Sequence, residues 1–125
     1  MDYQTHIETL LAQYGIEVDW RDSTRARSWR KSRRVRLCRV KTAITYATAL
    51  HEIGHVVGHQ SGRRIDKEAQ AWRWAETNAI EWREPMMRHA ARCIRSYLVA
   101  AARGKSRMWV PPQEHDAHAI AAWAD

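Results

Sequence analysis

The chain has 125 residues, which suffice for one domain with a core but leave little room for a second module. Its formal net charge is +7, from 21 Lys and Arg against 14 Asp and Glu. No secretory signal pattern opens the chain, and no apolar run approaches the roughly 20 residues that span a bilayer. Cys38 and Cys93 are too few for a disulfide framework. We therefore expect a soluble, cytoplasmic protein without membrane contact.

The first third of the chain predicts one helix followed by a small sheet. Apolar residues recur three and four apart within residues 2–14, as on the buried face of a helix, and Gly15 ends the pattern. Residues 16–20 and 33–40 alternate apolar and polar side chains, which is typical of half-buried strands. Between them, residues 21–32 are polar and basic, and we expect a connection there.

The remainder of the chain predicts three longer helices. The first covers residues 43–59 and begins after Thr42, whose hydroxyl suits a helix N-cap. The second covers residues 67–82 after a similar cap at Asp66. A proline then separates it from the third helix, residues 85–103, because the residue before proline avoids the helical region.

This order of elements predicts an α+β fold. We expect an N-terminal helix, a small β-sheet and then a group of packed helices. Residues 1–104 form one domain in this interpretation, and residues 105–125 form a C-terminal tail with a short helix over 117–123. The sequence leaves the oligomeric state open.

The motif with the clearest chemistry is the stretch from His51 to His55, which reads H-E-x-x-H. Two histidines four apart on a helix share a face, so their imidazoles can bind one zinc ion. Glu52 is rotated about 100° away, which suits a general base beside the metal. Gly54 costs the helix about 1 kcal/mol relative to alanine, and this indicates close approach of another element.

A catalytic zinc site needs a third protein ligand and an open position for water. His59 lies four residues beyond His55, but about 12 Å of helix rise separates it from His51. We therefore expect His59 to be a neighbour of the site or a surface residue. Ser61 also occupies the position where a third histidine would stand in the longer H-E-x-x-H-x-x-G-x-x-H motif.

An acidic residue on the following helix is the remaining source of a third ligand. Glu68 is our prediction, because Ala71 and Ala75 on the same side would let the two helices approach closely. Glu76 and Glu81 are alternatives that need a different offset between the helices.

Two segments resemble a known family. Residues 44–55, with His59 following, resemble the A-H-E-L-G-H-like helix of the ImmA/IrrE zinc metallopeptidases. Residues 68–75 resemble the E-x-x-A-x-x-F-A helix of that family, with Trp74 in the aromatic position. The resemblance implies a minimal zincin-like fold, in which the H-E-x-x-H helix packs against two further helices.

The resemblance also implies the activity. One zinc ion per chain would be held by His51, His55 and Glu68, and Glu52 would act as general base while water attacks a peptide carbonyl. The substrate implied is a protein, such as a helix-turn-helix repressor of a phage or mobile element. A further donor for the oxyanion is expected among Tyr46, His89 and His115, which the sequence does not rank.

Basic charge is concentrated between residues 21 and 41, a segment with ten Lys and Arg and a single acidic residue. Such a strip can attract nucleic acid or an acidic protein surface, or can simply be solvated. We consider four residues here as contacts for a substrate or partner: Trp29, Arg30, Arg34 and Arg36. In this hypothesis the strand over 33–40 is the sheet edge beside the metal, where a substrate segment adds as a strand.

Two alternatives to a peptidase follow from the same features. One is a basic module that binds nucleic acid without catalysis, and the other is a zinc-bound regulatory protein that sequesters a partner.

The chain contains seven tryptophans. Of these we expect Trp74 in the core, with Trp72 and Trp82 packed or at the rim of a cleft.

Overall fold

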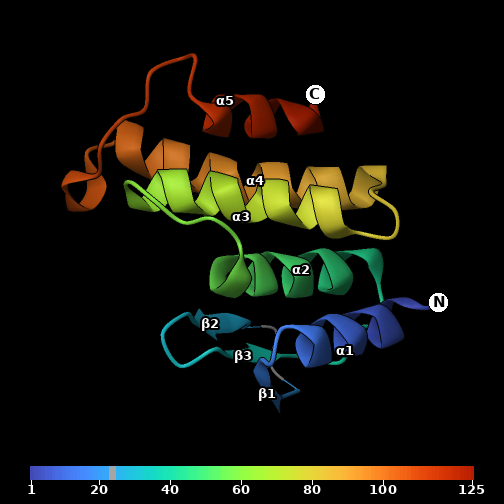
Figure 1. The fold of residues 1–125 in the computed structure, drawn as a ribbon. Coiled ribbons are helices and arrows are strands. Elements are labelled where there is room, and N and C mark those ends of the chain that lie inside the picture. Colours follow the sequence, from blue (N-terminus) through green and yellow to red (C-terminus); the bar gives the residue numbers. More distant parts are fainter. Residues whose placement is uncertain (23–24) are drawn as a thin grey trace.

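The computed structural model describes residues 1–22 and 25–125, and the two remaining positions belong to the predicted basic connection. Within the described ranges the protein is α+β, with five α-helices and a three-stranded mixed sheet (Figure 1). The elements are α1 (Tyr3–Gln13), β1 (Glu17–Trp20), β2 (Arg27–Trp29), β3 (Arg34–Leu37), α2 (Ala43–Val57), α3 (Arg64–Asn78), α4 (Glu84–Ala102) and α5 (Asp116–Ala121), with short 3-10 turns at Lys105–Arg107 and Ala122–Ala124.

The strand order in the sheet is β1-β3-β2. β3 pairs in parallel with β1, where Val18 lies beside Val35, and antiparallel with β2, where Ser28 lies beside Val35. The sequence did not indicate β2, because an Arg-Ser-Trp segment has no apolar alternation and forms a strand only by pairing with β3. The expectation that the strand within 33–40 is a sheet edge is therefore wrong: β3 is central, and β1 and β2 are the two edges.

The two faces of the sheet differ in the way the alternation predicts. Val35 and Leu37 point inward and are buried, where they join apolar residues of α1 and α2 in the core. Arg34 and Arg36 point to the opposite face. The inner face of the sheet thus rests on helices, while its outer face carries the arginines.

The helix starts follow from their caps in two cases and differ in a third. The side chains of Asp2 and Thr42 accept hydrogen bonds from the main chain of Thr5 and Thr45, at 2.7 and 3.1 Å, and so begin α1 and α2 as predicted. Asp66, however, does not precede α3. It lies inside the first turn, where its carboxylate accepts from the Arg63 N–H at 2.6 Å.

α2 lies at the centre of the molecule, between the sheet with α1 on one side and α3 with α4 on the other (Figure 1). Gly54 explains how α2 and α3 come so close. A Cβ at this position would lie 3.0 Å from the Ala71 carbonyl oxygen and 3.2 Å from Trp74 Cβ. The close approach expected at Gly54 is confirmed. Trp74 itself is only partly buried, whereas Trp72 is the fully buried tryptophan of α3.

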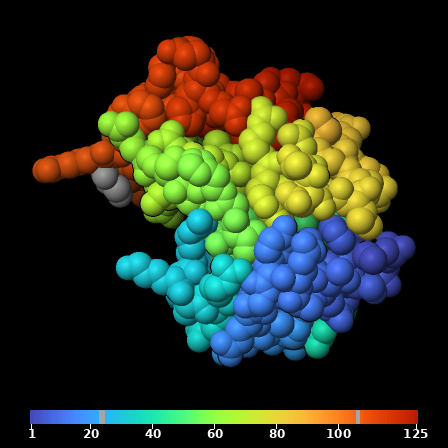
Figure 2. Space-filling model, in the orientation of Figure 1, coloured from blue at the N-terminus to red at the C-terminus, as the bar shows by residue number. Residues whose placement is uncertain are grey.

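The C-terminal residues pack onto α3 and α4 (Figure 2). The short helix expected over 117–123 is present as α5 and the 3-10 turn that follows it. Ala117 and Ile120 are fully buried, and Asp116 pairs with Arg73 of α3 at 2.6 Å. Among the described residues, no helix is both long enough and apolar enough to cross a membrane.

Candidate metal centre

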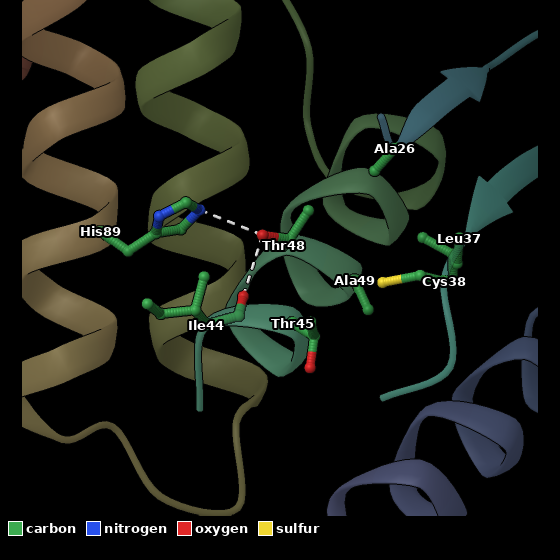
Figure 3. Close-up of a pocket in the computed structure, with 8 residues that line it drawn as sticks. All are labelled: Ala26, Leu37, Cys38, Ile44, Thr45, Thr48, Ala49 and His89. Atoms are coloured by element: carbon green, nitrogen blue, oxygen red, sulfur yellow. Dashed lines mark hydrogen bonds between the residues drawn. The ribbon is translucent and has the colours of Figure 1, made fainter. Parts of the chain in front are cut away.

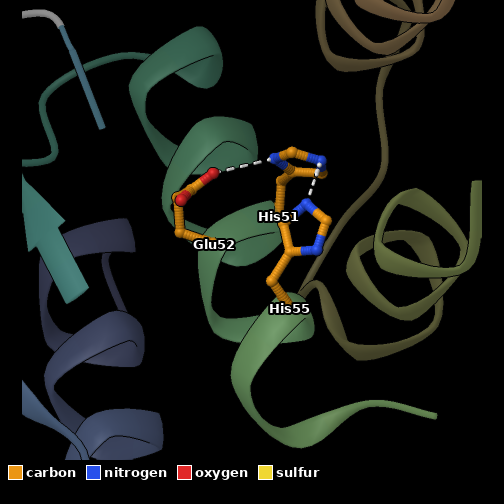
Figure 4. Close-up of side chains that lie close together, drawn as sticks. All are labelled: His51, Glu52 and His55. Carbon is orange, nitrogen blue, oxygen red and sulfur yellow. Dashed lines mark hydrogen bonds and ion pairs between the residues drawn. The ribbon is translucent and has the colours of Figure 1, made fainter. Parts of the chain in front are cut away.

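α2 brings His51, Glu52 and His55 together in one buried group (Figure 4). Each residue offers one ligand atom, and these atoms all lie within 4.8 Å of one another. His51 and Glu52 are each only 8% exposed, so their polar atoms are largely removed from water. Buried imidazoles and carboxylates at this spacing could hold a metal ion.

Glu68 reaches the same point from α3. Its Oε2 lies 3.4 Å from His51 Nε2 and in close contact with His55 Nε2, and the two Nε2 atoms are 3.1 Å apart. A tetrahedral ion with bonds of about 2.0–2.1 Å has ligand atoms about 3.3–3.4 Å apart. Two of the three separations are therefore close to this edge length, and the third pair, His55 Nε2 and Glu68 Oε2, is closer. Neither Glu76 nor Glu81 is part of this cluster: Glu76 pairs with Arg73 and Glu81 with Arg83.

Hydrogen bonds on the far side of each ring set the tautomers. Gln60 Nε2 donates to the Lys67 carbonyl at 3.1 Å, so its Oε1 accepts from His55 Nδ1 at 3.1 Å. His51 Nδ1 lies 3.2 Å from the carboxylate of Glu52. Both Nδ1 atoms are therefore donors, which leaves a lone pair on each Nε2. With both rings neutral, two lone pairs and a carboxylate converge, and this arrangement could hold a cation.

The pKa values of His51 and Glu68 show that the group favours a positive charge at its centre. Burial lowers the pKa of His51, but hydrogen bonds with the carboxylates of Glu52 and Glu68 outweigh burial and raise it to about 9. Burial raises the pKa of Glu68, but its hydrogen bonds with His51 and His55 outweigh this and lower it below its usual range. Without a metal, a proton on His51 serves as the cation, and a bound metal would displace it.

Glu52 stands beside this triangle of ligand atoms. Its Oε1 contacts Nδ1 of His51, the ring nitrogen that faces away from Glu68. Each imidazole presents Nε2 to the Glu68 side, so Glu68 is the carboxylate that both Nε2 atoms face, and Glu52 lies next to it against His51 Nδ1. A carboxylate in that position can exchange a proton with a water at the centre.

Two cavities open beside the centre, and His51, Glu68 and Tyr97 line both. One, of about 290 Å³, lies between β2 and α3 and also includes Glu52, His55, Gln60, Arg64 and Lys67. The other, of about 500 Å³, lies on the α4 side and also includes Thr48, Trp72, His89, Arg92, Cys93 and Ser96. A polypeptide that entered either cavity would meet the metal group.

The residues predicted as oxyanion donors or neighbours of the site have different surroundings in the structure. Tyr46 is fully buried, and its hydroxyl bonds His6 Nδ1 at 2.6 Å and the Ile80 N–H at 3.0 Å, so its assignment to the site is wrong. His59 is exposed and contacts Ser61 at 3.0 Å, which agrees with a surface role. His115 caps α5 and pairs with an aspartate of α3.

His89 alone among these candidates borders the centre. It lines the larger cavity, and its Nε2 lies 3.0 Å from the Thr48 hydroxyl. Burial lowers its pKa, which keeps the ring neutral at physiological pH. A neutral His89 can donate or accept a hydrogen bond but adds no charge to the site.

Tyr97 is a site residue that the sequence interpretation missed. Its hydroxyl accepts from Arg64 Nη2 at 3.2 Å, and burial followed by the charge of Glu68 raises its pKa, so it remains a protonated donor. The sequence spacing in α4 could have indicated Tyr97, because His89, Cys93 and Tyr97 are four residues apart and so share one face of the helix. All three line the larger cavity.

Trp72 forms the wall behind the centre. Its ring stacks on His51, with centroids 4.1 Å apart and planes 19° apart. Trp72 is 1% exposed and packs in the core, and it also lines the larger cavity. The stack fixes the His51 ring plane from the side that no ligand atom occupies.

The proposed partner contacts fall into two groups. Arg34 and Arg36 lie over the ring of Trp29, with guanidinium carbons 4.4 and 5.5 Å from its centroid. Arg30 is different, because it donates to the carbonyls of His55 at 3.0 Å and Gly58 at 2.7 Å. Arg30 thus caps the end of α2 and anchors the β2–β3 hairpin, so we withdraw it as a partner contact.

A third, smaller cavity of about 190 Å³ lies next to the N-terminal half of α2 (Figure 3). Its lining is mostly apolar and comes from α2, the end of β3, the residue before β2, and α4. It shares Thr48 and His89 with the larger cavity and Ala26 with the cavity at β2.

Comparison of the chain with known protein families, with curated proteins and with solved structures finds no match.

Proposed function

We propose that the protein is a zinc-dependent metallopeptidase. The observation that carries the proposal is the convergence of His51 Nε2, His55 Nε2 and Glu68 Oε2 on one point, with the carboxylate of Glu52 next to them against His51 Nδ1. Two imidazoles and one carboxylate are a ligand set of catalytic zinc, which keeps its fourth position open. The resemblance of the two helices to the ImmA/IrrE family, with its zincin-like fold, supports the same assignment.

Zinc in this position would supply Lewis acidity and lower the pKa of a water at the open position. Glu52 would take a proton from the attacking water and pass it to the leaving amine as the peptide bond breaks. Tyr97 is placed to donate a hydrogen bond to the developing oxyanion, because its hydroxyl borders both cavities beside Glu68. Gln60 and Glu52 hold the two imidazoles in the tautomers that bind metal.

The substrate in this proposal is a polypeptide bound in extended form. β2 is a free sheet edge in the described part of the chain, and Arg27 and Ser28 of β2 line the cavity that contains the centre. An extended segment can add to such an edge through main-chain hydrogen bonds. A helix-turn-helix repressor with an exposed loop would offer a segment of this kind.

Metal content and turnover test the proposal together. Plasma mass spectrometry of the purified protein should find one zinc per chain, lost in His55→Ala and Glu68→Ala. A quenched-fluorescence peptide library should report cleavage by the wild type and none by Glu52→Gln, which keeps its zinc. Absence of stoichiometric metal, even after reconstitution, would refute the proposal. A zinc-loaded wild type without turnover would favour the sequestering regulator instead.

A further inference from the structure

The free edge at β2 has a charge pattern that narrows the substrate class. This inference rests on the proposed function, since it concerns the segment that the same cavity would bind. β2 pairs with β3 on one side, and on its other side no strand lies among the described residues. Arg27 and Ser28 line the cavity that His51, His55 and Glu68 also line, so a segment along this edge would border that cavity.

Side chains of β2 alternate between two environments. Ser28 lies beside Val35, whose side chain is fully buried, and therefore points to the inner side. Arg27 lies beside Arg36, and Trp29 lies beside Arg34, both on the outer face. A strand added to β2 continues this alternation. Every second side chain of that strand would lie on the outer face beside Arg27 and Trp29 of β2, with the outer residues of β3 one strand further away.

The outer residues form one cationic group, which we call the Trp29 cluster: Arg27, Trp29, Arg34 and Arg36. The guanidinium carbons of Arg27, Arg34 and Arg36 lie 5.1, 4.4 and 5.5 Å from the Trp29 ring centroid. Three like charges thus surround a single indole, and they repel one another.

Ion pairs neutralise only part of the Trp29 cluster. Glu17 of β1 lies beside Arg34 in the sheet, but the two form no ion pair in the described part of the chain. Asp19 contacts Arg36 at 3.3 Å, but it also binds Arg21 at 3.1 Å. Within residues 1–22 and 25–125, Arg27 and Arg34 have no ion pair, and the buried Nε of Arg34 has no hydrogen-bond partner. The cluster therefore has unused donors and positive charge beside the free edge.

We propose that the protein selects an extended acidic segment, with carboxylates at alternate positions that face the Trp29 cluster. Opposite charges in neighbouring strand positions stabilise pairing, and like charges oppose it. A polypeptide fits better than a nucleic acid for two reasons. The edge offers main-chain hydrogen bonds, which a peptide strand complements. Three guanidinium groups lie over the Trp29 ring, so a base would have to compete with them for it.

Binding of labelled peptides to the Glu52→Gln protein tests this without turnover. The probe is a fluorescent octapeptide of alternating Glu and Val, measured by anisotropy at low salt. Two control peptides carry Lys in place of Glu, or Pro in place of two Val residues, which removes main-chain donors. We expect the Glu/Val peptide to bind at least about tenfold more tightly than either control.

A pair of charge reversals locates the site. Arg34→Glu should weaken binding of the Glu/Val peptide by about tenfold, whereas Arg103→Glu, with the same change in net charge, should alter it less than about twofold. Arg103 is exposed at the end of α4, outside the lining of the metal cavities. Equal effects of the two reversals, or equal binding of the Lys/Val peptide, would overturn the inference.

Two further measurements keep the inference separate from the proposed function. Zinc content is measured on each variant, so that lost binding with intact zinc overturns the acidic-strand site alone. Selective peptide binding by a protein that holds no metal supports the site and refutes the peptidase. A labelled oligonucleotide of equal charge that binds more tightly than the Glu/Val peptide and displaces it would overturn the inference in favour of nucleic acid.

Discussion

Gln60 provides the sharpest test of how the ligand histidines are held. Its Oε1 accepts from His55 Nδ1 at 3.1 Å, while its Nε2 donates to the Lys67 carbonyl at 3.1 Å. In Gln60→Ala the imidazole of His55 loses the partner that fixes its tautomer and its ring plane. Such a hydrogen bond contributes about 0.5–1.5 kcal/mol, and loss of an outer partner of a metal ligand weakens binding by about 10- to 100-fold.

Two further variants distinguish the effect of Gln60 on His55 from a general loosening of the loop between α2 and α3. Gln60→Glu keeps an acceptor for His55 Nδ1 and should bind zinc within about threefold of the wild type. Gln70→Ala removes a side chain that bonds the Ser61 N–H at 3.0 Å and the Ser61 carbonyl at 3.2 Å, so it loosens the same loop without touching His55.

The assay is a competition titration against a chromophoric zinc chelator at fixed pH, with circular dichroism as a check on folding. The expected order of affinity is wild type, Gln60→Glu and Gln70→Ala together, and then Gln60→Ala at least about tenfold weaker. The reasoning is refuted if Gln60→Ala binds zinc as tightly as the wild type. It is also refuted if Gln70→Ala loses as much affinity, because the effect would then belong to the loop.

Three other outcomes are expected. Tyr97→Phe should lower kcat by about 10²- to 10³-fold with zinc content and KM little changed, and an unchanged kcat would remove Tyr97 from the mechanism. The hydrogen-bonded ion pair with Arg73 lowers the pKa of Asp116 in the folded protein. The pair therefore stabilises the fold above about pH 4, and this stabilisation is lost as the pH falls through the pKa of folded Asp116. The difference in Tm between the wild type and Asp116→Asn should therefore shrink in acid, and a constant difference would contradict this. Arg30→Ala should lower the free energy of unfolding by about 1–3 kcal/mol, because it leaves the α2 carbonyls without a donor, whereas Lys31→Ala should change it by less than about 0.5 kcal/mol.

Local patterns predicted most of the helices and the centre of the site. Thr42 and Asp2 are caps whose partners lie three residues away, so their effect can be read from the sequence. His51, Glu52 and His55 are fixed relative to one another by a single helix turn. Gly54 indicated that another helix would approach α2, and α3 does so.

Features that depend on contacts between residues distant in sequence could not be predicted from local patterns. β2 has three residues and forms only because β3 pairs with it, so the identity of the free edge could not be read from either segment. Tyr46 and Tyr97 are both tyrosines on helices near the motif, but one bonds α1 and the other faces the cavities. Arg30 stood within a basic run, and only the tertiary structure shows that it caps α2.

The location of the ligands along the chain has a consequence for folding. His51, His55 and Glu68 all lie within one pair of adjacent helices, α2 and α3, and the loop between them is short. Contacts this local close at a small cost in chain entropy and form quickly. The sheet instead needs β1 to pair in parallel with β3, across the intervening β2, which is a slower kind of event. We therefore expect a nascent chain to assemble the proposed metal site in a helical hairpin first, and to complete the β2 edge only afterwards.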